Sequence, residues 1–467
     1  MKLQRVQVPD FRVLKNVDIS FEKDFVPNIF PLGSQNGGGK STLLQLIFVL
    51  LHCSGDSEKH EFIKNMLYGF EIDDSGKGVL AAIDIWDGEK TVSLEFIVCH
   101  DSYIKNDLNL FYEPLYYEHD IPSDNHEGII LSAPQELIRI ENEIKQIESQ
   151  ISKLAPLINR LQSINDIENP QDRESQLRIV ERSLVGLRIY NFPGKRDFKE
   201  RIVVEDMKNF IVQQLSLRQS NLQKLLDERE KLKYISPKIK DFLHSNNIIY
   251  IFSYSDCEDN NENKALLCRI NILNPEDFLA KISNNVFLAA PTTQVFLFLS
   301  QDARKLLFKQ QINYQSQIQK TKSKLAGFFP YDFLAVNLLV EIFKSARDKD
   351  FKQAIETGEY GNNYQQLVND LNQILLNKKI NINPDLSGFT FKLDAEGQDI
   401  ELYPEDLSHG ELKRLSIYAW IKYNIIEDSI VLIDEIENGF HPDWQYQIIK
   451  DIAEGAPENQ YIISTHS

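Results

Sequence analysis

The sequence predicts an α/β protein whose mixed core is interrupted by a long helical insertion. Three observations lead to this prediction. Strand-like segments near the amino terminus run into the glycine-rich stretch SQNGGGKST and then into an apolar helix. A seam of heptad spacing begins at Leu137, and four apolar residues precede Asp434 and Glu435. The chain of 467 residues is long enough for two or three domains.

Composition narrows the class of protein. The formal net charge is -18, from 69 acidic and 51 basic residues, which argues against a surface that binds nucleic acid or an anionic membrane all over. The four cysteines form no C-x-x-C pair, as expected of free thiols in a reducing compartment. Apolar runs such as residues 43–51 are too short to span a bilayer, and the amino terminus has no signal-peptide core. We therefore expect a cytoplasmic protein with no membrane contact.

The first 130 residues read as one mixed α/β lobe. LQRVQV and VLKNVDISFE alternate apolar and polar residues, which predicts two strands before the glycine loop. Residues 41–51 are apolar on nearly every face, which predicts a buried helix. A strand, a glycine loop and a buried helix in succession form the context in which backbone N–H groups bind phosphate.

The glycine loop departs from the phosphate-binding pattern G-x-x-x-x-G-K-[ST] at one place. Counted back from Lys40, the first glycine of the pattern falls on residue 34, where this chain has Ser34. The residues whose N–H groups would hold the phosphates, from Gly37 to Thr42, are intact. We expect Gly33, one place early, to supply the freedom of the turn, and we predict a working loop.

The helical insertion is predicted from a change in the spacing of apolar residues along the chain. From Leu137, apolar residues recur at alternating steps of three and four, at Ile140, Ile144, Ile147, Ile151, Leu154, Ile158 and Leu161. This spacing predicts a helix over residues 136–165 with a coiled-coil seam. A second set ends before Pro237 and consists of Ile211, Leu215, Leu222, Leu225 and Leu232. The two helices predict an antiparallel hairpin arm; the alternative is a pair of long helices packed flat on the lobe.

These patterns divide the chain into four expected parts. They are an amino-terminal lobe over residues 1–133, the coiled-coil arm over 134–236, a mixed α/β and helical segment over 237–380, and a carboxyl-terminal lobe over 381–467.

Two acidic residues end an apolar strand in SIVLIDEIENGFHPDW. Such a strand can place Asp434 where it orders Mg²⁺ through water, and Glu435 where it accepts a proton from an attacking water. The alternative is an apolar strand that merely ends in surface acids.

Two further segments can contact an anion. In LSHGELKRLSIYAWI, Ser408 and Gly410 precede a helix whose N-terminus can bind an anion, although Ser408 with Glu411 also forms a capping-box pattern. In QYIISTHS an apolar strand runs into Thr465 and His466, where a histidine can reach a phosphate or be purely structural.

Together, and in their order along the chain, the four segments resemble the ABC-type ATPase head, a P-loop NTPase, in the subclass split by a coiled-coil arm, as in SMC, RecF and OLD proteins. Under this resemblance SQNGGGKST is similar to the Walker A loop, LSHGE to the signature motif, LIDE to Walker B and STHS to the switch-histidine segment. ENGFHP stands where the D-loop lies. The implied fold is an α/β ABC ATPase head split by an antiparallel coiled-coil or helical insertion.

The resemblance implies ATP and Mg²⁺ as cofactors and assigns roles residue by residue. Lys40 would hold the β- and γ-phosphates, Ser41 and Asp434 the magnesium, Glu435 would be the general base, and His466 would sense the γ-phosphate. The nucleotide-binding set is Asn36, Gly37, Gly38, Gly39, Lys40, Ser41, Thr42 and Arg12.

The signature segment implies a partner copy. Ser408 and Gly410 would complete the site of the opposite protomer, so that ATP would join two heads in a homodimer or a higher homo-oligomer. His409 stands where the family usually has a glycine or an acid. Gln135 is the candidate for the Q-loop glutamine of the family.

The resemblance indicates the ATPase domain more clearly than its biological role. LSHGELKRLSIYAW and LIDEIENGFHPDWQYQI resemble most the ATPases of bacterial antiphage systems, the PtuA protein of Septu and certain retrons, which work with a separate HNH nuclease. This implies an ATPase that holds a nuclease subunit inactive. One alternative is an OLD-type nuclease whose Toprim domain would follow Ser467, in which case the sequence is shortened. The other is an SMC- or RecF-like DNA-repair ATPase whose arm embraces DNA.

Overall fold

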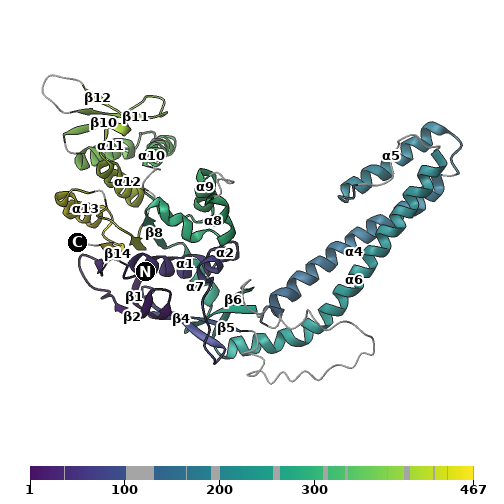
Figure 1. The fold of residues 1–467 in the computed structure, drawn as a ribbon. Coiled ribbons are helices and arrows are strands. Elements are labelled where there is room, and N and C mark those ends of the chain that lie inside the picture. Colours follow the sequence, from purple (N-terminus) through teal and green to yellow (C-terminus); the bar gives the residue numbers. More distant parts are fainter. Residues whose placement is uncertain are drawn as a thin grey trace. The chain divides into compact units, whose positions relative to one another are not determined.

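The computed structural model divides into two compact units, which we describe separately. The core unit comprises Met1–Tyr103 and Asn247–Ser467, and the helical unit comprises Ile104–Asn246. The structure describes residues 1–35, 37–100, 131–164, 166–190, 200–255, 263–308, 314–331, 335–375, 377–393, 400–423, 426–438 and 440–465. The α/β class predicted from the sequence is confirmed (Figure 1).

Over the described residues, the strands of the core unit form three sheets. An antiparallel sheet has the order β2-β1-β4-β5-β7-β6 and a parallel sheet the order β3-β14-β13-β8-β9, while β10-β11-β12 form a small antiparallel sheet. The strands of the first are β1 Lys2–Phe11, β2 Leu14–Ser20, β4 Lys77–Trp86, β5 Thr91–His100, β6 Ile248–Ser255 and β7 Asn263–Ile270. Those of the second are β3 Ile29–Gly33, β8 Val286–Ala290, β9 Phe328–Pro330, β13 Ile430–Ile433 and β14 Gln460–Thr465. Those of the third are β10 Lys378–Ile382, β11 Phe389–Leu393 and β12 Glu401–Leu402.

Helices of the core unit flank these sheets. They are α1 Lys40–Cys53, α2 His60–Leu67, α7 Pro275–Ser283, α8 Gln301–Phe308, α9 Tyr314–Lys324, α10 Ala335–Thr357, α11 Asn363–Ile374, α12 His409–Tyr423 and α13 Pro442–Gly455, with the short 3₁₀ turns η1 Ser57–Lys59, η2 Thr292–Phe298 and η3 Pro404–Asp406.

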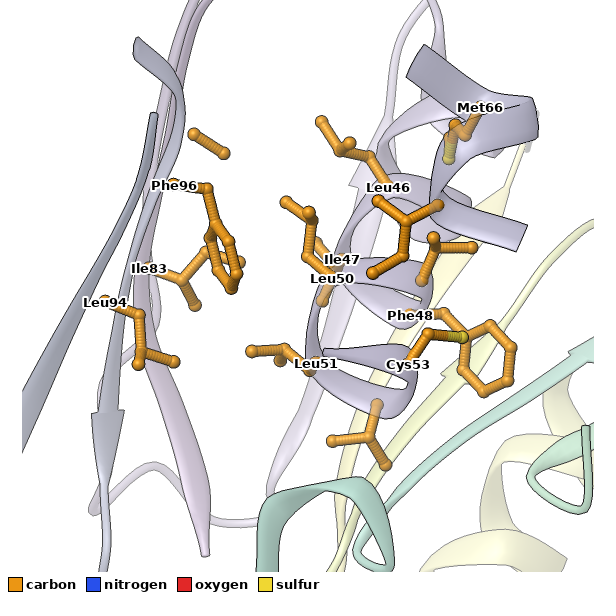
Figure 2. Packing of buried hydrophobic residues seen from close by; sticks show 14 of the residues in the cluster. Leu46, Ile47, Phe48, Leu50, Leu51, Cys53, Met66, Ile83, Leu94 and Phe96 are labelled. Carbon is orange, nitrogen blue, oxygen red and sulfur yellow. The ribbon is translucent and has the colours of Figure 1, made fainter. Parts of the chain in front are cut away.

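The helix α1 lies between the antiparallel and the parallel sheet. Every residue from Leu43 to Cys53 is buried, which confirms the helix predicted to be apolar on nearly every face. Figure 2 shows Ile83, Leu94 and Phe96 of the antiparallel sheet facing this helix, with Phe48 on its opposite side. Since both faces are covered, α1 has no polar stripe, and the burial of its side chains fixes the helix and the glycine loop that precedes it.

The two strands predicted before the glycine loop are present as β1 and β2. A third strand, β3, leads directly into the loop and was not predicted, because it is short and contains Pro31. It is an edge strand of the parallel sheet, where a missing N–H is tolerated, and pairs with β14 from Ile29 to Gly33. The glycine loop therefore begins at the carboxyl end of a parallel strand.

The helical unit consists of α4 Ala133–Ile164, α5 Pro170–Gly186 and α6 Glu200–Ser245 over its described residues. The end of α4 packs on the start of α6, because Leu161 and Ile164 share a core with Val204 and Met207, so the two helices are antiparallel. Arg218 of α6 also donates to Gln150 of α4 at 3.0 Å. The predicted helix over 136–165 is confirmed.

One expectation for the helical unit needs correction. The second helix does not end before Pro237: α6 continues to Ser245 with that proline inside it. A proline removes one N–H donor, and a long helix with packed neighbours tolerates the loss. Between α4 and α6 the chain forms a further helix, α5, which the sequence analysis did not predict. It begins with an Asn169 cap that accepts from Gln171 N at 3.0 Å and with Pro170 in the first turn.

No helix that the structure describes is long and apolar enough to cross a membrane.

Candidate functional site

The glycine loop joins β3 to α1 and depends on three glycines. Gly37 and Gly39 have φ angles of 80° and 85°, the left-handed region that other residues rarely adopt. A Cβ at Gly39 would also lie 2.6 Å from Leu14 Cδ2. Gly38 is needed for space, since a Cβ there would collide with Ser34 Oγ and lie 3.0 Å from Gln35 O. Asn36 lies outside the described residues.

Ser34 fits the loop in place of the first glycine of the phosphate-binding pattern. Its Oγ donates to Gln35 O at 3.2 Å, and its carbonyl accepts from Lys40 Nζ at 2.9 Å. The expectation that Gly33 supplies the turn's freedom is wrong. Gly33 is the last residue of β3, paired with Thr465, and its φ is not positive. The freedom is taken up at Gly37 and Gly39 instead.

Asp434 follows β13 and is completely buried. Its Oδ1 accepts from the Ser464 hydroxyl at the end of β14, and its Oδ2 accepts from the Gln294 side-chain amide. Its own N–H donates to Ala289 O at 2.8 Å. A buried carboxylate must be compensated by donors or cations, and both of these side-chain donors are neutral. The alternative of a surface acid at the end of the strand is wrong for Asp434.

Glu435 occupies a turn rather than the strand. Its φ angle is 49°, and its N–H donates to Ser464 Oγ at 2.9 Å. The hydroxyl of Ser464 therefore binds both acidic residues, through the side chain of one and the backbone of the other. The Glu435 carboxylate is partly exposed and has Asn438 Nδ2 at 3.4 Å.

Gln294 was missed by the sequence analysis, which offered Gln135 instead. Gln135 lies in α4 of the helical unit. Gln294 lies in η2, directly after β8, which pairs in parallel with β13 and thus ends beside Asp434. The signal was present as the buried strand VFLAA followed by PTTQ, but its meaning depends on which strand β8 pairs with.

Gln45 connects the glycine-loop helix to this cluster. Its Nε2 donates to Gln294 Oε1 at 2.6 Å, and both amides are buried. Ser41 precedes Gln45 by four residues and therefore lies on the same face of α1. The chain Gln45, Gln294, Asp434 thus places the face that carries Ser41 toward the buried carboxylate.

The parallel sheet explains why these groups meet. Four neighbouring strands, β3, β14, β13 and β8, run in one direction and end at Gly33, Thr465, Ile433 and Ala290. In open parallel sheets, ligands bind at the carboxyl edge of the strands. His466, the residue after β14, lies outside the described residues.

Arg12 lies in the turn between β1 and β2. Its Nη2 donates to Met66 O at 2.7 Å, and burial, with the nearby charge of Arg304, lowers the pKa of its guanidinium. The next residues, Val13 and Leu14, fill the space beside Gly39. The turn that carries Arg12 therefore abuts the glycine loop.

The signature segment begins α12. Ser408 and Glu411 form the capping box that was the alternative interpretation: Ser408 N donates to Glu411 Oε2 at 2.9 Å, and Glu411 N donates to Ser408 Oγ at 3.3 Å. Burial works to raise the pKa of Glu411, but hydrogen bonds from Lys378 and Ser408 hold it below its ordinary value. Ser408 and His409 are exposed and Gly410 is buried.

The residues fit a magnesium ion with phosphate ligands. The described residues contain no group of three His, Cys, Asp or Glu side chains that could hold a metal. Mg²⁺ commonly takes one or two protein oxygens and completes its shell with phosphates and water. The Asp434 carboxylate and the Ser41 hydroxyl are donors of this kind.

Comparisons with known proteins also indicate an ATPase. Residues 289–467 match the family model "AAA domain, putative AbiEii toxin, Type IV TA system". The chain is 32% identical over 111 residues to "Retron Vc95 probable ATPase" of Vibrio cholerae serotype O1 biovar El Tor, a match that covers 21% of this chain and 20% of that protein. The chain thus spans about a fifth of the length of this curated relative. These matches support an ATPase of the AAA/ABC-like type. The region of the family match includes Gln294, Asp434 and Glu435.

Structural comparison gives two Smc head domains. The head domain with an extended coiled coil from Pyrococcus furiosus, bound to the C-terminal domain of ScpA, is 13% identical with a TM-score of 0.30, covering 100% of this chain and 89% of that one. The head domain with a coiled coil and joint from Pyrococcus yayanosii is 12% identical with a TM-score of 0.31, covering 99% and 92%.

The loop geometry predicts unequal effects of two alanine substitutions. Gly38→Ala should weaken ATP binding at least about tenfold, because its Cβ collides with Ser34 Oγ. Gly33→Ala should change affinity less than about twofold, since nothing lies within 4 Å of its Cβ. Ser34→Gly combined with Gly38→Ala should recover part of the loss. Titration with a fluorescent ATP analogue measures all three, and wild-type affinity in Gly38→Ala would contradict the geometry.

Proposed function

We propose that this protein binds and hydrolyses Mg-ATP at the carboxyl edge of its parallel sheet. The observation that carries the proposal is the buried chain from Gln45 through Gln294 to Asp434, which joins the glycine-loop helix to the strand with two acids. A glycine loop before a buried helix can hold phosphates, and a buried carboxylate beside it can hold their magnesium.

Each residue of the loop has a defined task in this proposal. The N–H groups from Gly37 to Thr42 bind the phosphates, and Lys40 exchanges its bond to Ser34 O for phosphate oxygens. Ser41 and Asp434 would hold a magnesium ion, whose charge would offset the negative charge of the phosphates. Arg12 and His466 are proposed to lie near the nucleotide.

Glu435 is proposed as the general base. Its backbone is fixed by Ser464 while its carboxylate remains partly exposed, so the carboxylate can accept a proton from a water. Asp434, by contrast, has no exposure to an attacking water. Each of its oxygens accepts one hydrogen bond and keeps a second lone pair for a cation, so Asp434 suits a metal ligand and not a base.

Two substitutions separate binding from hydrolysis. Glu435→Gln should keep ATP affinity within about twofold and lower kcat roughly 100-fold or more, because the amide cannot accept the proton. Lys40→Ala should lose binding itself, since it removes the cation from the loop. Phosphate release and equilibrium binding are the measurements. Equal hydrolysis in Glu435→Gln and the unchanged protein would rule out Glu435 as the base.

We further propose that two copies join through their heads, with Ser408 and Gly410 completing the site of the opposite copy. What supports this is that Ser408, at the start of α12, is exposed and can be reached by a second copy.

The molar mass of Glu435→Gln should double when Mg-ATP is added. Adding Ser408→Arg should abolish the increase, because a long cationic side chain then occupies the interface. Ser323→Arg, on an exposed position of α9, should leave it intact. A mass that is high without nucleotide and unaffected by ATP would indicate a standing assembly and contradict ATP-driven joining.

We also propose a role in antiphage defence, in which the ATPase holds a separate nuclease inactive until infection alters its nucleotide state. The support is the retron ATPase similarity, which covers a short segment. A nuclease encoded beside this protein should co-purify with it from co-expressing cells, and release of the nuclease should depend on nucleotide. Glu435→Gln is the informative variant, because it stays in the ATP-bound state. Failure of any neighbouring nuclease to bind would remove this role and leave the ATPase proposal in place.

A further inference from the structure

A lysine of the signature helix binds the turn that carries Glu435. Lys413 lies in α12, five residues after Ser408, and only 4% of it is exposed. Its Nζ donates to Glu435 O at 2.9 Å and to Asn438 O at 2.9 Å. The same ammonium lies 4.1 Å from the centre of the Tyr331 ring and 5.1 Å from that of Phe440. Two carbonyls and two aromatic faces therefore surround one positive charge.

The turn that Lys413 binds is a strained one. Glu435 has a φ angle of 49°, which lies in the left-handed region that a residue with a Cβ adopts only at an energetic cost. Its carbonyl accepts from Lys413, from Asn438 N at 3.1 Å and from the Tyr331 hydroxyl at 3.2 Å. These donors hold the carbonyl, and the backbone direction they fix decides where the Glu435 carboxylate points.

The neighbouring charged residues of α12 bind other elements. Glu411 pairs with Lys378 of β10, and Arg414 pairs with Asp451 of α13. Arg414 also donates to Ile374 O at the end of α11, at 3.0 Å. The segment from Glu411 to Arg414 thus connects α12 to β10, α11 and α13. Through Lys413 it also contacts the turn that carries Glu435.

We propose that Lys413 is a positioning residue that couples the signature helix to the general base within one protomer. This inference rests on the proposed function. When Ser408 meets the nucleotide of the opposite copy, α12 shifts, and Lys413 transmits the shift to the carbonyls of Glu435 and Asn438. Hydrolysis then becomes competent in a protomer whose own signature helix is engaged. In this proposal Lys413 acts through the backbone of Glu435 and Asn438 and not on the nucleotide itself.

The coupling requires the compact ammonium of a lysine. Three donors on one atom can reach both carbonyls and still face the two rings. Methionine has a similar length and fills the same space, but it carries neither charge nor donor. Glutamine keeps an N–H donor without the charge, so it should satisfy part of the turn.

The test separates catalysis from binding in ATP hydrolysis by the full chain. Lys413→Met should lower kcat at least about tenfold with KM changed less than about twofold, and Lys413→Gln should lie between it and the unchanged protein. The matched control is Lys422→Met, on the same helix, whose Nζ binds Asp370 at 2.8 Å and the Tyr418 hydroxyl at 3.0 Å. That variant should keep both kcat and KM.

The outcomes distinguish this inference from the proposed function. If the unchanged protein hydrolyses ATP and Lys413→Met has the same kcat, the coupling is wrong and the ATPase stands. A rise in KM with kcat unchanged also overturns it, since that would place Lys413 in binding. If the unchanged protein neither binds nor hydrolyses ATP, the proposed function fails first. Should Lys413→Met fail to fold by circular dichroism, Lys413→Gln carries the same comparison.

Discussion

The buried carboxylate of Asp434 is the constraint on which the candidate site depends. A charged group with no exposure is tolerated only where donors surround it. Its donors, Ser464 and Gln294, come from segments on either side of β13, and Gln45 of α1 binds the second of them. Segments hundreds of residues apart must therefore meet at one edge of the sheet before this carboxylate can be buried.

The same constraint explains an otherwise odd residue in α1. A helix covered by sheets on both faces should be apolar throughout, yet Gln45 is buried within it. Its amide is satisfied by Gln294, so a polar group is retained in the core because it orders the site. The rest of the helix, by burying its apolar side chains, holds the glycine loop at the end of β3. Packing and site geometry are thus set by one element.

The glycine loop adds a second, local constraint. Ser34 and Gly38 share one space, so the serine that departs from the phosphate-binding pattern is accommodated by the glycine four residues later. Lys40 meanwhile binds the carbonyl of Ser34, which keeps its ammonium folded onto the loop. Beyond the loop, the backbone of Glu435 is held by Ser464, Tyr331 and Lys413, from three different elements.

Local patterns predicted the elements that have strong periodicity or composition. The helix α1, the strand β13 and the seam of α4 follow from the order of apolar residues alone, and the acids after β13 were recognised from their position. Gln294 was not recognised, because its role depends on β8 pairing with a strand more than a hundred residues away. The end of α6 was predicted too early, at Pro237, because a proline disfavours a helix locally. The helix around Pro237 is long and continues through it. The role expected of Gly33 was wrong because the sequence does not show which glycine of the loop takes the left-handed φ angle.

The most direct measurement is a crystal structure of Glu435→Gln grown with Mn²⁺ and ATP, with the metal located by its anomalous scattering. The account predicts one metal peak between the phosphates and the side chains of Ser41 and Asp434, with Gln294 beside it. The phosphates should lie on the N–H groups from Gly37 to Thr42. Nucleotide bound elsewhere, or a metal remote from Asp434, would contradict the claim that this buried carboxylate and the glycine loop form one site.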